Sequence, residues 1–168
     1  MDQVLLELDS LLHHNGGVEK LSPVIQGLLK ELDQSRAQPQ AWQPLEDNFF
    51  DTKLPAGIVS SWIFALRGGG KFTNERHPNS WQRSIALSGQ ALFEVYDNDI
   101  WQPRPLNGSG VNIGERAISI PPNMWHRIAI GPKTFVSLSF HSAPASELIE
   151  ETCVGDDFSQ THRRFYHG

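Results

Sequence analysis

The sequence has little cysteine, no cluster of positive charge and no long hydrophobic run. Its 168 residues include one cysteine, which excludes an internal disulfide and is compatible with a reducing compartment. The formal net charge is -5 and no run of lysine and arginine occurs, which argues against nucleic acid and membrane surfaces as partners. Apolar runs stay far short of the ~20 residues that cross a bilayer. The first residues, MDQVLLELDS, are acidic where a secretory signal is basic. We therefore expect a soluble, cytoplasmic protein.

The sequence also lacks the short motifs of two large enzyme classes. No G-x-S-x-G motif of a nucleophilic hydrolase is present. The glycine-rich stretch RGGGK, residues 67–71, does not have the strand–loop–helix spacing of a phosphate-binding loop. Nucleophilic hydrolysis and nucleotide binding are therefore not expected. We expect a small-molecule substrate of another kind.

Leucine and valine recur at helical spacing near the start of the chain. The first apolar stripe consists of Val4, Leu5, Leu8, Leu11 and Leu12. A second helix is predicted with Ser22 as its N-cap and Pro23 at its first helical position. Because neither stripe can be buried within its own helix, we expect the two helices, within residues 1–38, to pack on a larger unit.

From about residue 48 the sequence changes to short β-rich runs separated by Gly, Pro and Asn. Residues 34–44 are polar with two prolines and indicate a connection. The expected strands lie within residues 58–66, 84–96 (with a turn at Ser88-Gly89), 100–101, 117–120, 127–130 and 134–140. This spacing favours a mainly β, antiparallel sandwich or barrel over a parallel α/β sheet. We expect a single domain, 1–168, with a barrel over 48–144 and a C-terminal tail over 145–168.

Two spaced patterns of polar residues and glycines lie in the β-rich part. They read Gly70-x4-Glu75-x-His77-x4-Gln82-x6-Gly89 and Gly114-x6-Pro121-x-Asn123-x2-His126. These patterns resemble the two signature motifs of the cupin superfamily, small jelly-roll barrels that commonly bind a divalent metal. The resemblance puts Glu75 in place of the first family histidine, Gln82 in place of the usual glutamate and Asn123 in place of a turn glycine. Asn readily adopts a left-handed turn conformation, so the last change is mild.

The spacing of these residues favours a metal site. Residues i and i+2 of a strand face the same side, so Glu75 and His77 can point into a barrel, where His126 would join them from a later strand. Two imidazoles and one carboxylate on one side of an ion are typical of non-haem Fe(II) oxygenases. We predict one divalent metal, Fe(II) first, with Ni, Zn or Mn as alternatives. Gln82 could bind the ion or hydrogen-bond a neighbour, and we favour the second role. The alternative for Glu75 is a solvated loop carboxylate.

The segment WHRIAIGPKTFVSLSFHSAP, residues 125–144, resembles the C-terminal barrel segment of the cysteine dioxygenases, which are thiol dioxygenases. The resemblance implies that His77 and His126 are two of the three iron-binding histidines. It also implies that Ser137 is the serine of a Ser-His-Tyr relay. The sequence departs from that family where the other relay residues fall, since Ser139 replaces the histidine and His141 the tyrosine. His141 is nevertheless a candidate for moving a proton.

Cations and aromatics near the motifs supply further candidates for the pocket. The arginine that binds the substrate carboxylate in cysteine dioxygenases has no clear match, and Arg83, Lys53 and Arg67 are the candidates to hold an anionic group. Trp81 and Trp125 each directly precede a motif residue and are candidates to wall a pocket.

The sequence leaves three functions open. The first is a cupin dioxygenase that acts on a small polar substrate, for instance a thiol or a carboxylate. The second is a ligand-binding or regulatory cupin without catalysis, which the substitutions in the family motifs favour. The third is a sugar isomerase or epimerase, in which a histidine acts as general base without O2. Members of the cupin superfamily are commonly dimers and the helical pair offers an interface, so a homodimer is one alternative and the sequence leaves the oligomeric state open.

Overall fold

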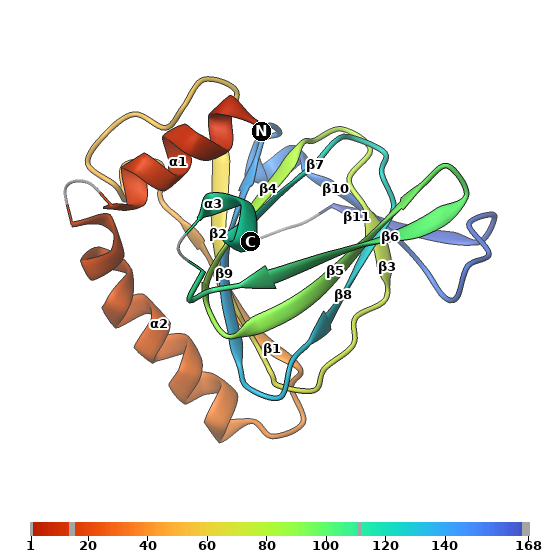
Figure 1. Cartoon of the computed structure of the whole chain (residues 1–168), viewed down its shortest axis with the longest axis horizontal. Helices are drawn as coiled ribbons and strands as arrows, with labels where there is room; N and C mark the ends of the chain where they lie inside the picture. The colour runs from red at the N-terminus through yellow and green to blue at the C-terminus, as the bar shows by residue number, and fades with distance from the viewer. Residues whose placement is uncertain (1, 14–15, 111, 166–168) are drawn as a thin grey trace.

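Two antiparallel sheets form the body of the molecule in the computed structural model, which describes residues 2–13, 16–110 and 112–165. The five-stranded sheet has the order β1 (Gln40–Leu45), β2 (Ser60–Leu66), β9 (Phe135–His141), β4 (Gln82–Ser88) and β7 (Ala117–Ile120). The six-stranded sheet has the order β11 (Thr161–Phe165), β10 (Ile149–Cys153), β3 (Asn74–Arg76), β8 (His126–Ile130), β5 (Gln90–Asp97) and β6 (Ile100–Asn107). The predicted mainly β, antiparallel jelly-roll architecture is confirmed (Figure 1).

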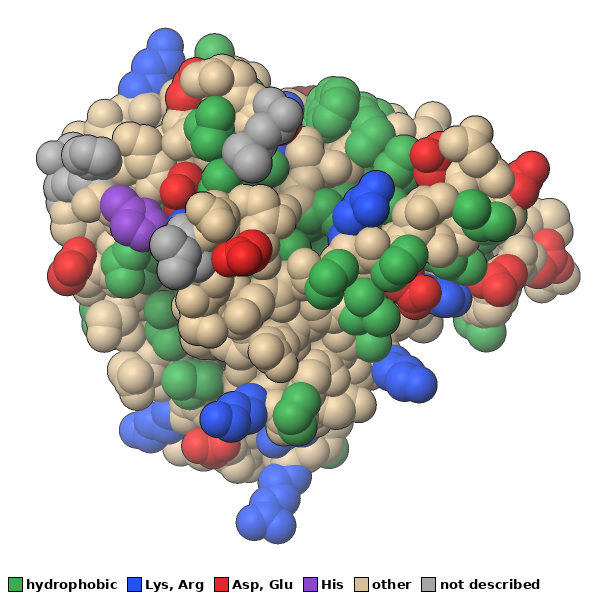
Figure 2. Space-filling model, viewed as in Figure 1, with side chains coloured by type: hydrophobic (Ala, Val, Ile, Leu, Met, Phe, Trp, Pro, Cys, Tyr) green, Lys and Arg blue, Asp and Glu red, His purple; other side chains and the backbone are tan. Residues whose placement is uncertain are grey.

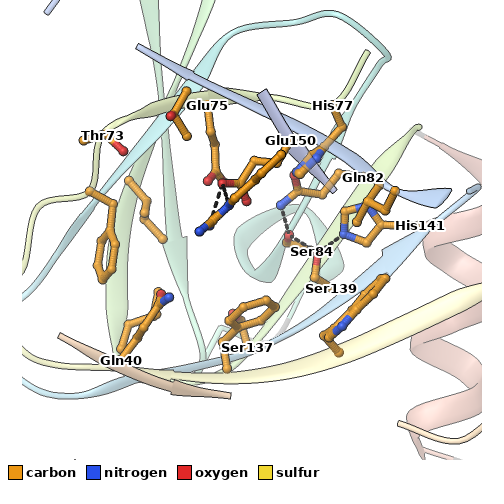
Figure 3. A pocket seen from close by; sticks show the side chains of 18 of the residues that line it. Gln40, Thr73, Glu75, His77, Gln82, Ser84, Ser137, Ser139, His141 and Glu150 are labelled. Carbon is orange, nitrogen blue, oxygen red and sulfur yellow. Dashed lines mark hydrogen bonds and ion pairs between the residues drawn. The ribbon is translucent and has the colours of Figure 1, made fainter. Parts of the chain in front are cut away.

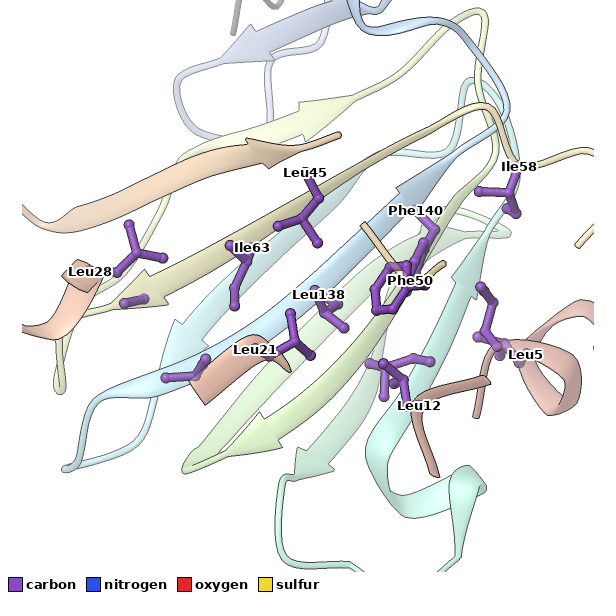
Figure 4. Close-up of a cluster of buried hydrophobic side chains, with 14 of the residues drawn as sticks. Leu5, Leu12, Leu21, Leu28, Leu45, Phe50, Ile58, Ile63, Leu138 and Phe140 are labelled. Atoms are coloured by element: carbon purple, nitrogen blue, oxygen red, sulfur yellow. The ribbon is translucent and has the colours of Figure 1, made fainter. Parts of the chain in front are cut away.

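The two N-terminal helices cover the outer side of the five-stranded sheet. Helix α1 (Gln3–His13) and helix α2 (Gly17–Gln34) lie beside β2 and β9 in Figure 1. A short helix, α3 (Ile113–Arg116), precedes β7. Figure 4 shows leucines of both helices meeting side chains of the sheet in one buried cluster. The helical pair therefore packs on the barrel, as its two apolar stripes predict.

Helix α2 begins earlier than the sequence predicts. It starts at Gly17, so Ser22 is not its N-cap and Pro23 lies inside it. Leu21, in the extra turn, is fully buried against the sheet. Burial of an apolar side chain stabilises a helix more than local propensity does, and this explains why the predicted start is wrong.

The two faces of strand β9 contact different parts of the molecule. All seven of its residues are buried. Val136, Leu138 and Phe140 belong to the cluster under the helices, whereas Ser137 and Ser139 line a cavity between the sheets. Alternate side chains of a strand point to opposite faces, so β9 is apolar toward the helices and polar toward the barrel interior.

Three strands lie where the sequence predicts a connection or a tail. Strand β1 occupies part of the expected connection, and β10 and β11 occupy part of the segment 145–168. Both β1 and β11 are edge strands, and β1 contains Pro44, which an edge tolerates. The sequences of the three strands, QAWQPL, IEETC and THRRF, are rich in polar residues and lack the apolar alternation that predicts a strand.

Two turn residues of the family-like motifs have the left-handed conformation that their positions require. Asn123 has φ 67°, so its expected role in place of a turn glycine is confirmed. Gly89 has φ 75°, and a Cβ there would lie 2.4 Å from the carbonyl oxygen of Thr134. Gly89 therefore makes the predicted turn between β4 and β5 and also allows a close approach of two backbones.

Within the described residues, no helix is long and apolar enough to cross a membrane. On the face seen in Figure 2, Lys and Arg side chains stand apart from one another among acidic, apolar and polar ones.

Candidate metal centre

Glu75, His77 and His126 come together at the inner side of the six-stranded sheet. Glu75 lies in β3 directly opposite His126 in β8, and His77 follows the end of β3. Each residue offers one ligand atom, and these atoms all lie within 4.8 Å of one another. The spacing is close enough for one ion to contact all three, so the cluster could hold a metal.

Backbone carbonyls hold both histidine rings in one orientation. His77 Nδ1 lies 3.0 Å from the carbonyl oxygen of Ile149, and His126 Nδ1 lies 3.1 Å from that of Met124. Because a carbonyl can only accept a hydrogen bond, each Nδ1 must carry the proton. Each neutral ring then has its lone pair on Nε2, the atom that binds metals when Nδ1 is held in this way.

The contact between Glu75 and His126 needs a positive charge. Glu75 Oε1 lies 3.2 Å from His126 Nε2. If His126 is neutral, both atoms are acceptors, and they repel each other. A proton on Nε2 or a bound cation removes the repulsion, and the donor set of two nitrogens and one carboxylate oxygen suits a divalent transition metal.

The pKa values of Glu75 and His77 are both lower than usual. Burial raises the pKa of Glu75, but the hydrogen bond with His126 and the charges of His126, His77 (when protonated) and Arg164 lower it more. Burial lowers the pKa of His77, which keeps its ring neutral. An ionised carboxylate beside a neutral imidazole is a ready ligand pair.

A cavity of about 500 Å³ opens beside the cluster, between the two sheets. In Figure 3, Glu75 and His77 approach it from one wall and Ser137 and Ser139 from the other. Part of its lining is apolar and includes Phe64, Leu66, Phe72, Phe93 and Ile128. A volume of this size, lined by apolar side chains on one part and by many polar and charged ones on the rest, suits a small polar organic molecule.

Two residues proposed from the sequence, Ser137 and His141, form a polar stripe along β9 together with Ser139. Ser137, Ser139 and His141 all line the cavity at alternate positions. The Ser139 hydroxyl oxygen lies 3.0 Å from His141 Nε2, and the His141 ring centre lies 5.0 Å from that of His77. Burial holds the pKa of His141 well below its usual value, so its ring is neutral.

Gln82 faces the same cavity from β4. Its Nε2 donates to the Ser84 hydroxyl at 3.2 Å, while its buried Oε1 has no hydrogen-bond partner among the described residues. A buried carbonyl oxygen without a partner is costly, and a ligand, water or ion in the cavity would remove that cost. Gln82 also lies close enough to His77 for a side-chain hydrogen bond to act on the pKa of that ring, so its oxygen is not evidence of a ligand by itself and both roles considered for Gln82 stay open.

The three cations proposed to hold an anionic group lie elsewhere. Arg83 alternates with Gln82 and points out of the barrel, where its Nε donates to Asp2 at 2.7 Å. Arg67 donates to the carbonyl oxygens of Ser35 at 3.0 Å and of Leu32, at the end of α2. Lys53 is exposed and does not line the cavity. The period of the strand explains why Arg83 points away from the cavity, and the carbonyl oxygens at the end of α2 hold Arg67 away from it.

The two proposed pocket tryptophans also lie outside the cavity lining. Trp81 is 39% exposed beside Arg83, whose Cζ lies 5.1 Å from the ring centre. Trp125 stacks on Phe158, with ring centres 5.0 Å apart, and lies under the guanidinium of Arg76. Both rings therefore pack other parts of the barrel.

The sequence analysis did not propose three charged residues that line the cavity, Glu150, Arg163 and Arg164. Glu150 in β10 and Arg164 in β11 both line it, and Arg164 Nε donates to Glu150 Oε1 at 2.8 Å. Burial, and the nearby charge of Glu75, raise the pKa of Glu150 to about 7. The pairs Glu150-Glu151 and Arg163-Arg164 are complementary, and this pattern could have predicted two pairing strands.

Comparison with known proteins supports the fold. No protein-family model matches the chain, and no curated protein matches it. The coconut allergen cocosin has a TM-score of 0.54 and 16% identity, over 71% of this chain and 30% of that one. An 11S globulin from Wrightia tinctoria has a TM-score of 0.54 and 14% identity, over 71% and 28%. Lactobacillus farciminis oxalate decarboxylase has a TM-score of 0.50 and 17% identity, over 64% and 30%.

These similar structures define the class of fold. They are cupin-fold proteins, so the chain has the cupin jelly-roll fold that its two motifs predict. The chain spans less than a third of the length of each protein just named. The likeness extends to the cupin fold in general and does not single out the thiol dioxygenases.

Proposed function

We propose that this protein is a metal-dependent cupin oxidoreductase, a dioxygenase that acts on a small polar substrate. The observation that carries the proposal is the convergence of Glu75, His77 and His126 within 4.8 Å at the edge of a cavity of about 500 Å³. A bound divalent ion, Fe(II) first among the candidates, would supply Lewis acidity and a place for O2 beside the substrate.

Other residues of this chain would orient the metal ligands, contact the substrate and transfer a proton. The carbonyls of Ile149 and Met124 orient the two imidazoles, so that little ordering is needed when a ligand binds. The apolar side chains of the lining, among them Phe64, Phe72 and Phe93, would contact the apolar part of a substrate. The imidazole of His141, held by the Ser139 hydroxyl, is the group that would accept or return a proton of the substrate.

Metal content tests the proposal directly. The protein is purified, offered Fe(II), Mn, Ni and Zn in turn without oxygen, and analysed by mass spectrometry of the metals. We expect one equivalent in the wild-type protein and none in His77→Ala or His126→Ala. His162→Ala, on an exposed strand that borders the cavity, is the matched control and should keep its metal. Full metal content in the His77 and His126 variants would overturn the assignment.

Oxygen consumption in a screen of small substrates then tests the dioxygenase reaction. Turnover of a substrate by the metal-loaded protein without consumption of O2 would favour an isomerase or epimerase instead. A thiol substrate, a homodimer and a cytoplasmic location stay predictions from the sequence.

One observation favours a second candidate, a ligand-binding cupin without a metal. The Glu75–His126 contact at 3.2 Å satisfies both side chains if His126 carries a second proton. Wild-type protein that takes up none of the four metals, yet binds small molecules in the cavity, would support this alternative.

A further inference from the structure

Four polar side chains form a patch on the cavity side of two paired strands. Gln82 and Ser84 of β4 are the register partners of His141 and Ser139 of β9, and all four line the cavity. Ser139 Oγ lies 3.0 Å from His141 Nε2, and Figure 3 marks this contact. Because residues i and i+2 of a strand face the same side, the spacing of Ser139 and His141 brings a hydroxyl group and an imidazole together.

A serine hydroxyl beside an imidazole nitrogen is the pair that carries nucleophilic acyl transfer in many hydrolases. The sequence has no G-x-S-x-G motif, and for that reason it predicts no such chemistry. The pair is nevertheless defined by its geometry and not by a sequence motif, since it occurs on unrelated folds. In this chain the pairing of β4 with β9 and the alternation along β9 supply the geometry.

The surroundings of His141 direct the lone pair of Nε2 toward Ser139. His141 Nδ1 lies 3.5 Å from Ser80 Oγ. Ser80 Oγ donates its own proton to the carbonyl oxygen of Trp81 at 2.8 Å, so toward Nδ1 it can only accept. Nδ1 then carries the ring proton, and Nε2 is left to accept the proton of Ser139. The Trp62 ring stands at 89° to the imidazole, with ring centres 4.9 Å apart, and limits its rotation.

Ser84 places a hydrogen-bond donor beside the same oxygen atom. Its Oγ accepts from Gln82 Nε2 at 3.2 Å and lies 3.5 Å from Ser139 Oγ. The Ser84 proton is therefore placed to reach an oxygen atom next to Ser139, which is where the carbonyl oxygen of a bound ester becomes negative during attack. The hydroxyl of Ser80 stands where a Ser-His-Asp triad has a carboxylate, so the imidazolium gains less stabilisation and an ester with a good leaving group is favoured.

We infer that Ser139 is a nucleophile, with His141 as its general base, and that the cavity accepts small esters with a good leaving group, such as phenyl esters. This acyl-transfer activity goes beyond the proposed oxidoreductase function and needs no metal. The Ser139 oxygen bonds to the ester carbonyl carbon while its proton passes to His141 Nε2. The bond from that carbon to the phenol oxygen then breaks, and the phenol leaves with the proton. Water hydrolyses the acyl-serine to the carboxylic acid and restores the Ser139 hydroxyl.

Reaction with p-nitrophenyl acetate tests the inference in protein kept metal-free by a chelator. Release of p-nitrophenolate gives the rate, and mass spectrometry of acid-quenched protein locates any acetyl group. We expect an acetyl group on Ser139 and a rate at least about tenfold above that of Ser139→Ala, because a positioned general base contributes roughly 10²–10⁴-fold. His141→Gln can still accept the Ser139 hydrogen bond but cannot take up the proton, so it should lose the rate to a similar extent.

Two variants and one neighbouring serine guard the interpretation. Ser139→Cys keeps a nucleophile at the same position and should be acetylated there, which a merely structural role of Ser139 does not predict. Ser119→Ala, which removes a hydroxyl bonded to Asp2 and outside the cavity lining, should react like the wild type. Ser137 lines the same cavity from the same face of β9 and should stay unlabelled. Circular dichroism checks that each variant is folded.

The inference fails if the wild type carries no acetyl group on Ser139, if Ser137 is labelled equally, or if Ser139→Ala or His141→Gln reacts as fast as the wild type. Zinc content of the same variants separates it from the proposed function, since hydrolysis by a bound metal leaves no acetyl group on a serine. If the wild type binds no metal but is acetylated on Ser139, the proposed function fails and the nucleophile stands. If zinc binds with normal stoichiometry and Ser139 stays unmodified, the nucleophile fails and the metal site stands.

Discussion

Glu75 and His126 are direct partners across the β3–β8 ladder, and Glu75 Oε1 lies 3.2 Å from His126 Nε2. The pairing of two strands that are far apart in sequence thus sets the distance between two candidate metal ligands. A shift of one residue in this register would turn one of the side chains to the other face of the sheet. The geometry of the site is therefore a property of the barrel and not of either motif alone.

Replacement of Glu75 by glutamine should separate the metal centre from a merely polar contact. Loss of the carboxylate charge is expected to weaken metal binding by more than about 100-fold, since even a partner of a ligand is worth roughly 10–100-fold. Zinc titration with a chelator competitor measures the affinity. Glu147→Gln, which changes an exposed carboxylate, is the control and should bind zinc normally. Unchanged zinc affinity in Glu75→Gln would show that the Glu75 carboxylate is not a metal ligand.

Two glycine substitutions should change stability in opposite directions. Gly89→Ala places a Cβ 2.4 Å from the Thr134 carbonyl oxygen at φ 75°, so the free energy of unfolding should fall by about 1–3 kcal/mol or more. Gly27, in the exposed middle of α2, has no atom within 4 Å of an added Cβ. Gly27→Ala should raise the free energy of unfolding by roughly 0.5–1 kcal/mol. Urea unfolding of both variants measures the difference, and similar effects would contradict the turn geometry.

Asp2 should make stability depend on pH. Partial burial raises its pKa, but hydrogen bonds from Ser119 and Arg83 lower it more, so the folded-state pKa lies below the unfolded value of about 4. The stabilisation is then present above the unfolded pKa and is lost as pH falls through the folded pKa.

Asp2→Asn isolates the charge, because asparagine still accepts the N–H of Val4 at the start of α1. The variant should be about 1 kcal/mol less stable than the wild type at pH 7, and the difference should nearly vanish below about pH 3. Urea unfolding at several pH values measures it. A difference that stays constant across this range would show that the Asp2 charge is not the cause.

Much of the fold, and the metal-binding cluster of the candidate site, can be predicted from the spacing of residues in the sequence. Alternation of apolar and polar residues along 134–140 predicts a strand, and the structure adds that both of its faces are buried. The left-handed turns at Gly89 and Asn123 are local properties that follow from residue type. The i, i+2 spacing of Glu75 and His77 places both on one side of the chain. Two of the three residues of the cluster can therefore be predicted from local sequence.

Other features depend on contacts between distant segments, which no local pattern specifies. Arg83 has the charge to bind an anion, but strand pairing turns it outward to Asp2, 81 positions earlier in the chain. Arg164 enters the cavity only because β11 pairs with β10 and brings it beside Glu150. By itself the sequence determined most of the jelly-roll strands, β1, β10 and β11 excepted, and the residues able to bind a metal, because propensity, turn chemistry and side-chain type are local. The tertiary structure alone decided which charges face the cavity, because that follows from strand register and burial.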